Sequence, residues 1–349
     1  MSATSSPLRV CSYEDRAIAM DSLILMAESL CAVDRNISLH LTVPQAPQSV
    51  LAWAERWPQV VISTTRPDKV TGWDVKPWLL LQELNAGSQE VVWLDTDMIV
   101  TRPISTMLQE FLPDSLIVAE EWDASEAPPY HQFWGYPFGR RIPSINACVL
   151  RVTPTHRPLL QSYLQMTQDQ RYRHVQALPI EQRPFVLLGD SPLLIALLES
   201  KDFAGVSFDC LRMGRHIAQC AGSSGYRPHH RILDLFRGLP PLIHGLGRKP
   251  WDYSPEQTGL PRFLLDLATD VSPYVLAAQK AAKDIGMTPD WFETRTWLGG
   301  LFRRSTANHP GLAGLPLAIV HALHMSFVQM MGRIEPARST EYEAKPTPD

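Results

Sequence analysis

Two aspartates one residue apart, Asp95 and Asp97, directly follow the apolar run Val91–Leu94. Four apolar residues in a row, two of them β-branched, predict a strand that is buried on both faces of a parallel sheet. In open α/β sheets, ligands bind outside the carboxyl ends of the strands, so both carboxylates are expected beside a ligand. Carboxylates at this spacing suit a hard divalent cation that also holds phosphate oxygens. The alternative is two exposed acids in a turn, although two close like charges at a strand end need a neutralising partner.

Alternating strands and helices are expected to position these acids. Apolar runs predict strands near residues 8–13, 39–43, 60–63, 116–119, 145–150 and 206–208. Helical apolar spacing predicts helices near residues 20–31, 50–57, 75–84, 158–168 and 193–198. The alternation predicts a parallel, Rossmann-like sheet. No glycine-rich phosphate loop follows the first strand, which excludes a dinucleotide fingerprint and a P-loop.

Two further features lie between the acids and the end of this pattern. Asp190 precedes Ser191, Pro192 and an apolar run, so its structural interpretation is a helix N-cap. The irregular segment 120–144 holds Trp122, Tyr130, His131, Phe133, Trp134, Tyr136 and Phe138. Long irregular segments are often functional, and aromatic rings stack on the C–H faces of sugars. An acceptor-binding surface and an aromatic cluster covering a sheet edge are equally supported.

Composition limits the class of protein. The 349 residues are 45% hydrophobic, enough for a sizeable core, and the net charge of -4 with no basic stripe argues against nucleic acid as a partner. The five cysteines are scattered, lack metal-type spacing and are expected to be reduced thiols: Cys11, Cys31, Cys148, Cys210 and Cys220. Residues 1–7 hold no apolar run, so we expect no signal peptide and a cytoplasmic protein.

Four blocks, in this order, resemble the retaining, metal-dependent glycosyltransferases of the GT-A type, the family of glycogenin and the bacterial lipopolysaccharide galactosyltransferases. Ser12-Tyr13 resembles the nucleotide-base site, and Lys76 lies ahead of Val92-Trp93-Leu94-Asp95-Thr96-Asp97, which resembles the metal-binding Asp-x-Asp strand. Asn146-Ala147-Cys148-Val149-Leu150 resembles the Asn-Ala-Gly-Val-Leu strand. The segment from His244 to Trp251, hereafter the late loop, resembles the metal-and-phosphate loop. The resemblance covers residues 8–252.

The resemblance implies a fold and a set of site residues. The fold would be a GT-A-type, Rossmann-like mixed sheet flanked by helices, with a mainly helical C-terminal extension. Asp95, Asp97 and His244 would bind the cation, and Asn146 and Asp190 would line the sugar pocket as catalytic candidates. The residues implied in nucleotide-sugar binding are Ser12, Tyr13, Lys76, Asp95, Thr96, Gly247, Arg248 and Lys249. Lys249 stands one residue nearer the histidine than is usual in the family, so Arg248 shares the phosphate role as an alternative.

The chemistry of these residue types agrees with the resemblance. A nucleotide-sugar leaves as a diphosphate whose charge a metal neutralises as a Lewis acid, with lysine or arginine adding donors. A nitrogen ligand among oxygens suits Mn²⁺ better than Mg²⁺, which favours all-oxygen shells and is the second candidate. A single histidine is most often structural, but His244 ends a strand and precedes a glycine-rich, basic loop.

The C-terminal third contains no recognisable site residues. We expect a catalytic domain over residues 1–252, a helical extension over 253–334 and a disordered tail over 335–349. Residues 315–331 are apolar but interrupted by His321, His324 and Gln329, which predicts a core or docking helix in place of a spanning one. Peripheral membrane contact through this extension is the alternative.

The predicted function is a metal-dependent, retaining transfer of a hexose from a nucleotide-sugar, with UDP as the expected nucleotide. The acceptor would be a carbohydrate, glycolipid or protein. One alternative is a sugar-phosphate nucleotidyltransferase, although that class carries a glycine-rich, basic loop after its first strand and Cys11-Ser12-Tyr13-Glu14-Asp15 is neither. The other is a binding protein that keeps the fold and the nucleotide site without turnover.

Overall fold

The computed structural model describes residues 7–68, 70–121, 129–179, 182–221, 225–251, 259–306 and 309–330. Its strands are β1 (Leu8–Tyr13), β2 (Ile37–Thr42), β3 (Val60–Ser63), β4 (Val91–Leu94), β5 (Met98–Val100), β6 (Leu116–Glu120), β7 (Ile145–Val152), β8 (Phe208–Leu211), β9 (Ile217–Gln219) and β10 (Leu242–His244). Its α-helices are α1 (Met20–Val33), α2 (Gln48–Ala54), α3 (Val75–Asn85), α4 (Ile104–Leu108), α5 (Tyr130–Phe133), α6 (Arg157–Gln168), α7 (Gln170–Gln176), α8 (Ser191–Glu199), α9 (Pro228–Arg237), α10 (Gly259–Asp270), α11 (Pro273–Lys283), α12 (Trp297–Ser305) and α13 (Leu315–Met330).

The large sheet has seven strands in the order β3-β2-β1-β4-β7-β6-β8. Strand β1 pairs in parallel with β2 and β4, whereas β7 runs antiparallel to both β4 and β6. The expected mixed sheet flanked by helices is therefore confirmed, and the parallel pairing predicted from the alternation of strands and helices fails only at β7 among the strands of the large sheet. Parallel neighbours need a long crossover, usually a helix, and the described part of the connection from β6 to β7 contains only the four-residue α5.

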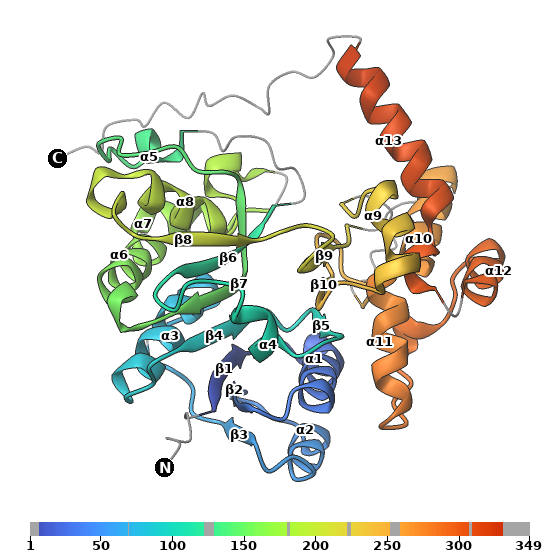
Figure 1. Cartoon of the computed structure of the whole chain (residues 1–349), viewed down its shortest axis with the longest axis horizontal. Coiled ribbons are helices and arrows are strands. Elements are labelled where there is room, and N and C mark those ends of the chain that lie inside the picture. The colour runs from blue at the N-terminus through green and yellow to red at the C-terminus, as the bar shows by residue number, and fades with distance from the viewer. Residues whose placement is uncertain are drawn as a thin grey trace.

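Helices cover both faces of the large sheet (Figure 1). In β4, Val91 and Trp93 belong to the core on the face covered by α3, α6 and α8. Val92 and Leu94 belong to the opposite core, which includes residues of α1 and α2. A strand buried on both faces was predicted from this apolar run, and its position between two helical layers explains why all four side chains are apolar.

A small sheet of three strands, ordered β5-β10-β9, adjoins the large one. Strand β10 pairs antiparallel with β5 and parallel with β9. The apolar residues before and after the two acids thus form two strands, β4 in the large sheet and β5 in the small one. Residues 95–97 connect these two strands. The three residues predicted to carry the metal chemistry therefore lie where the two sheets meet, because β10 ends at His244.

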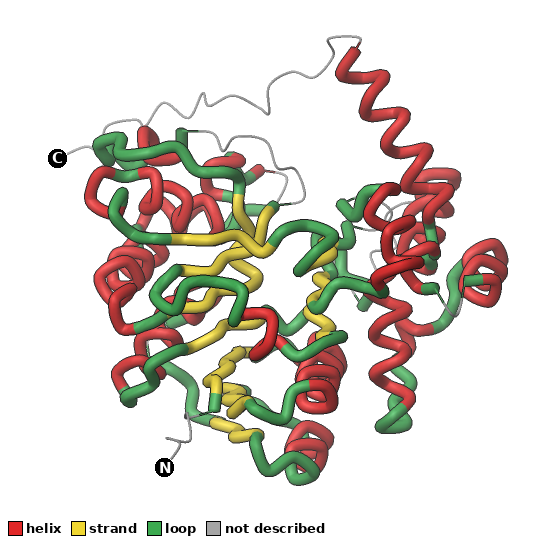
Figure 2. Tube along the Cα trace, viewed as in Figure 1, coloured by secondary structure: helices red, strands yellow, loops and turns green. Residues whose placement is uncertain are grey.

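Helices dominate the described chain beyond the late loop, so the expected helical C-terminal extension is confirmed (Figure 2). Helix α11 packs on α1 and β5, and Tyr274 and Val275 share a buried cluster with Ile99 and Ile243 of the small sheet. The domain boundary at residue 252 stays a prediction, and the tail at 335–349 lies outside the described residues. In the described part of the chain, no helix is long and apolar enough to span a bilayer.

Candidate metal centre

The side chains of two aspartates and one histidine meet where the two sheets adjoin. One ligand atom from each of Asp95, Asp97 and His244 lies within 4.8 Å of the others. The Asp95 N–H donates to the Cys148 carbonyl of β7 at 2.9 Å, and the Gly245 N–H donates to the Asp97 carbonyl at 2.9 Å. Pairing with β7 on one side and with the late loop on the other therefore fixes the backbone on both sides of the acids.

The His244 ring is oriented by its neighbours. Its Nδ1 lies 3.4 Å from Oε1 of Gln219, which is its partner in the β10–β9 register. Its Nε2 lies 3.5 Å from Oδ1 of Asp97. When Nδ1 carries the proton and faces Gln219, Nε2 presents its lone pair towards the two carboxylates, as metal-ligating histidines do.

The electrostatics of the cluster favour a cation. Burial alone would lower the pKa of His244, but Cys148 and Asp97 raise that pKa to about 10. Burial alone would raise the pKa of Asp97, but Lys249 and His244 hold it well below its usual range. Asp97 and His244 are only 7% and 3% exposed. The raised pKa shows that the acids favour a positive charge at this point, and a metal ion that displaces the proton from His244 would meet two carboxylates and one imidazole, a donor set that fits Mn²⁺.

Lys76 and Asp190 form a buried ion pair beside the cluster. The Lys76 Nζ lies 2.8 Å from Oδ2 of Asp190 and 3.2 Å from Oδ1 of Asp95, and it donates to the Ala147 carbonyl at 2.7 Å. Burial alone would lower the pKa of Lys76, but Asp190 and Asp95 raise it above its usual value. Lys76, expected to bind the nucleotide-sugar, therefore neutralises two carboxylates in this structure.

Asp190 occupies the predicted N-cap position of α8, but the capping role predicted for its side chain is wrong. The side chain makes no capping hydrogen bond. Its Oδ2 accepts a hydrogen bond from the Tyr163 hydroxyl at 2.9 Å and faces Lys76. The carboxylate of Asp190 thus binds Lys76 and Tyr163 in place of the N–H groups at the start of α8. The Lys76 ammonium lies between Asp190 and Asp95 and contacts both.

The late loop brings basic side chains to the cluster. Lys249 Nζ donates to Oδ2 of Asp97 and, at 2.7 Å, to the Gly245 carbonyl. A Cβ at Gly245 would lie 3.2 Å from the buried Tyr274 ring, so a side chain there would require that ring to shift slightly. Gly247 adopts a φ of +73°, which favours glycine. Arg248 is exposed. Of the predicted phosphate-binding residues, Lys249 therefore contacts the cluster directly.

Residues at the end of β1 lie on the other side. The Ser12 hydroxyl donates to the Leu94 carbonyl, and the Tyr13 hydroxyl donates to Asp15 at 3.1 Å. The Thr96 hydroxyl donates to Glu14 at 2.7 Å, and Arg16 donates to both oxygens of that carboxylate. Glu14 was not among the predicted residues. Because β1 and β4 are adjacent and parallel, the acid that follows β1 reaches the same edge, a signal that appears only once the strand order is known.

Asn146 and Cys148 occupy β7. The Asn146 amide donates to Glu121 at 3.1 Å, and its oxygen accepts the Cys148 N–H at 2.9 Å. Cys148 is fully buried and its thiol interacts with His244, a contact that sequence reasoning missed, as it missed Gln219. All five cysteines are buried and free of disulfides.

Most of the described aromatic side chains in the segment 120–144 pack in or against the protein core. Trp122 lies outside the described residues. Tyr130 belongs to the core, and Phe133, Trp134 and Tyr136 pack against it. His131 is buried and lies 3.0 Å from Glu199 of α8, whereas Phe138 is 54% exposed. These contacts favour the aromatic cluster over an acceptor-binding surface for every described member except Phe138.

No family model and no curated protein sequence matches the chain. Among solved structures, the galactosyltransferase LgtC in complex with donor and acceptor sugar analogs has 14% sequence identity and a TM-score of 0.48, over 81% of this chain and 98% of that chain. The glycosyltransferase GlyE of Streptococcus pneumoniae TIGR4 has 12% identity and a TM-score of 0.45, over 84% of this chain and 66% of that chain. Mouse xyloside xylosyltransferase 1 has 15% identity and a TM-score of 0.43, over 69% of this chain and 97% of that chain. Similarities of this size assign neither an activity nor a substrate to the chain.

Proposed function

We propose that the chain is a metal-dependent glycosyltransferase that transfers a hexose from a UDP-sugar to a carbohydrate, glycolipid or protein acceptor, with retention of anomeric configuration. The observation that carries the proposal is the convergence of Asp95, Asp97 and His244 within 4.8 Å at the junction of the two sheets. Lys249 adds a cation that contacts the same cluster. Acids and an imidazole that can bind a cation, beside a lysine that can bind phosphate oxygens, complement the charges of a nucleoside diphosphate with a bound cation.

The transfer breaks the bond between the anomeric carbon and the diphosphate oxygen, and the electron pair leaves with the diphosphate. The acceptor hydroxyl oxygen forms the new bond, and its proton passes to the departing diphosphate. A cation held by Asp95, Asp97 and His244 would supply Lewis-acid stabilisation of the leaving charge. The Lys249 ammonium, on a flexible stem, would add hydrogen bonds to the same oxygens.

We propose Asp190 as the group that steadies positive charge on the sugar during a retaining transfer. Asp190 is 5% exposed, and the Lys76 ammonium lies between its carboxylate and that of Asp95. Asn146 is the second candidate, although both ends of its amide already have protein partners. An oxocarbenium-like state needs a nearby negative or polar group, and a carboxylate held by Lys76 and Tyr163 is preorganised for that task.

Thermal stabilisation by a panel of UDP-sugars with Mn²⁺, followed by measurement of UDP release, tests the proposal. We expect one UDP-sugar to raise the melting temperature only when Mn²⁺ is present and to be hydrolysed slowly without acceptor. Asp97→Asn should abolish both effects, whereas the exposed Asp202, outside the cluster, provides the matched control Asp202→Asn.

The two other candidate functions give different results in the same assays. A binding protein would show Mn²⁺-dependent stabilisation without UDP release. A nucleotidyltransferase would release pyrophosphate from a nucleoside triphosphate and a sugar phosphate. Stabilisation and UDP release that are equal in Asp97→Asn and Asp202→Asn would contradict the metal-dependent transfer.

A further inference from the structure

Two lysine ammonium groups already occupy the acidic cluster. Lys249 Nζ contacts Oδ2 of Asp97. Lys76 Nζ lies between the carboxylates of Asp190 and Asp95. The two ammonium groups thus neutralise all but one of the negative charges of the three carboxylates. A divalent cation held by Asp95 and Asp97 would bring two more positive charges into the same partly shielded space, where like charges repel strongly. Binding of the cation therefore requires one ammonium group to withdraw.

Lys249 is the ammonium that can withdraw. The Lys76 side chain is 4% exposed, and besides its two carboxylates it donates to the Ala147 carbonyl at 2.7 Å. The Lys249 side chain is 25% exposed, and its second partner is the Gly245 carbonyl of the late loop, at 2.7 Å. Turning a partly exposed, flexible lysine towards water is less costly than breaking a buried ion pair. Lys249 is therefore the group that a cation would displace.

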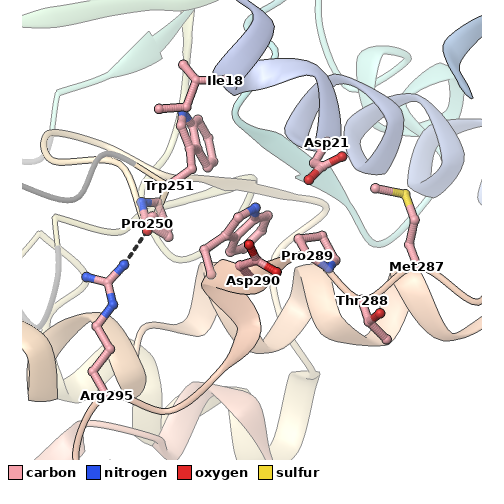
Figure 3. A pocket seen from close by; sticks show the side chains of 10 residues that line it. Ile18, Asp21, Pro250, Trp251, Met287, Thr288, Pro289, Asp290 and Arg295 are labelled. Atoms are coloured by element: carbon pink, nitrogen blue, oxygen red, sulfur yellow. Dashed lines mark hydrogen bonds between the residues drawn. The ribbon is translucent and has the colours of Figure 1, made fainter. Parts of the chain in front are cut away.

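The backbone of the late loop is anchored near both ends, so the displacement needs only the lysine side chain. At the start, the Gly245 N–H donates to the Asp97 carbonyl at 2.9 Å. At the end, Arg295 donates to the Pro250 carbonyl at 2.5 Å, beside a cavity that Trp251 also lines (Figure 3). The lysine stem can therefore rotate while the loop keeps its place beside the acids.

A nucleoside diphosphate would supply oxygens for both positive groups. Its oxygens are the hard ligands that a divalent cation prefers, and they also accept charge-assisted hydrogen bonds from a lysine. Without the diphosphate, a displaced Lys249 ammonium exchanges a carboxylate for water. With the diphosphate, it exchanges one anionic partner for another, so the cation meets much less competition for Asp97.

We propose that Lys249 competes with the divalent cation for Asp97 in the ligand-free protein and turns to the phosphate oxygens when a nucleoside diphosphate binds. The cation and the diphosphate then each favour the binding of the other, and the coupling is reciprocal. The protein binds the cation weakly by itself and tightly together with the diphosphate. This inference rests on the metal centre of the proposed function and adds to it a reason why cation and donor bind together.

Calorimetric titration of the full chain with Mn²⁺ alone, without any nucleotide, tests the competition. We expect Lys249→Met to bind Mn²⁺ at least about tenfold more tightly than the unaltered protein, because no ammonium competes for Asp97. Lys249→Arg keeps a positive charge and should show no such gain. Lys201→Met alters an exposed lysine outside the cluster and should bind Mn²⁺ as the unaltered protein does.

The same titration with UDP present measures the coupling. UDP coordinates Mn²⁺ directly and tightens Mn²⁺ binding in every variant, but the gain should be at least about tenfold smaller in Lys249→Met than in the unaltered protein. A lysine that only binds phosphate would leave the affinity for Mn²⁺ alone unchanged when it is replaced. A lysine that only holds the late loop in place would lower that affinity. Either result would overturn the competition.

The outcomes also distinguish this inference from the proposed transfer. Tighter Mn²⁺ binding by Lys249→Met, without UDP release from any UDP-sugar by the unaltered protein, would support the competition and contradict the transfer. UDP release by the unaltered protein, with the same Mn²⁺ affinity in Lys249→Met, would support the transfer and contradict the competition. No Mn²⁺ binding by either protein would overturn both.

Discussion

Gln219 determines which nitrogen of His244 faces the acids. Its Oε1 lies 3.4 Å from Nδ1, and its amide nitrogen donates to the Glu120 carbonyl. Partners of this kind orient a metal-binding imidazole, and their loss lowers metal affinity by about 10- to 100-fold. We therefore expect Gln219→Leu to weaken Mn²⁺ binding by about that factor, measured by calorimetry.

Gln219→Glu separates orientation from packing, because it keeps an acceptor for Nδ1–H, although it loses the donor to Glu120 and adds a negative charge beside the His244 ring. It should bind Mn²⁺ more tightly than Gln219→Leu. If both variants bind Mn²⁺ as the unaltered protein does, Gln219 has no role in orienting His244.

Asp190→Asn is expected to lower stability as well as turnover. Replacing an N-cap aspartate by asparagine would change the free energy of unfolding little, but Asp190 is a buried partner of Lys76. Removing one member of a buried pair is costly, and because Asp95 remains beside Lys76 we expect a loss of about 1–3 kcal/mol in urea denaturation.

Tyr163→Phe removes only the hydroxyl that donates to Asp190 and should cost about 1 kcal/mol. Comparing Asp190→Asn with Tyr163→Phe separates the loss of the Asp190 charge from the loss of one hydrogen bond to its carboxylate. Near-normal UDP release by Asp190→Asn would remove Asp190 from the proposed reaction and leave it a structural residue.

At the scale of the elements, we expect α5 and the aromatic residues around it to stabilise the fold and to make no contact with the acceptor. Trp134 packs against the core, and the Arg171 guanidinium lies 5.1 Å from its ring. Removing a half-buried indole should cost about 2 kcal/mol. Trp134→Ala should thus lower the melting temperature and reduce donor hydrolysis and transfer equally.

Phe138 is the matched comparison, since it belongs to the same segment and is 54% exposed. Phe138→Ala should leave the melting temperature nearly unchanged. A selective loss of transfer in Trp134→Ala, with donor hydrolysis and stability intact, would restore the acceptor-binding interpretation.

Helix α9 should make stability depend on pH through Asp234. Burial raises the pKa of Asp234 from 3.8 to about 6, opposed by the Tyr226 hydroxyl and by Arg231 and Arg102. The folded protein therefore binds a proton at higher pH than the unfolded chain does, so this group adds stability as the pH falls from about 7 to about 4.

Asp234→Asn should remove this contribution. Because Asp234 is only partly buried, we expect the stability difference between the unaltered protein and the variant to change by about 1 kcal/mol across that range, in favour of the unaltered protein at low pH. Urea denaturation at several pH values measures it. A difference that is independent of pH would mean that Asp234 titrates alike in both states.

The sequence predicted many elements because their patterns are local. The strand at 60–63, the two-sided burial of β4 and the end of β10 at His244 follow from apolar runs. The direction of β7 and the small sheet depend on how distant segments pair, which a local pattern does not encode. The same holds for the site: the positions of Asp95 and His244 follow from strand ends, whereas Glu14 and Gln219 become visible only through neighbouring strands.

At the scale of the whole molecule, the C-terminal helices leave apolar side chains in water. Helices α9 and α13 pack against each other, and α13 stands beside α9 in Figure 1. The exposed residues are Ile232, Leu233, Leu235, Phe236, Ile319, Val320, Leu323 and Phe327, with Phe236 82% exposed. Exposed apolar side chains that lie close together are typical of interaction sites, and the peripheral membrane contact expected for the C-terminal extension stays a prediction that this surface makes testable.

Sedimentation with phospholipid vesicles measures this contact. The double variant Phe236→Ser and Phe327→Ser should reduce the bound fraction several-fold, whereas Leu112→Ser, at a position 66% exposed in another part of the molecule, should not. Absence of vesicle binding, together with a dimer in analytical ultracentrifugation that the double variant abolishes, would assign the surface to self-association.

The junction of the two sheets also determines when, during synthesis, the site can exist. Lys249 is 152 residues beyond Asp97, and His244 lies only a few residues before it. When the ribosome has released the two acids, Lys76 is already available to Asp95, but the His244 imidazole and the Lys249 ammonium that contact Asp97 have not yet been synthesised. Non-local contacts of this kind form late. A nascent chain stalled before β10 should therefore show no Mn²⁺-dependent protection from proteolysis, and protection should begin only once the late loop has left the exit tunnel.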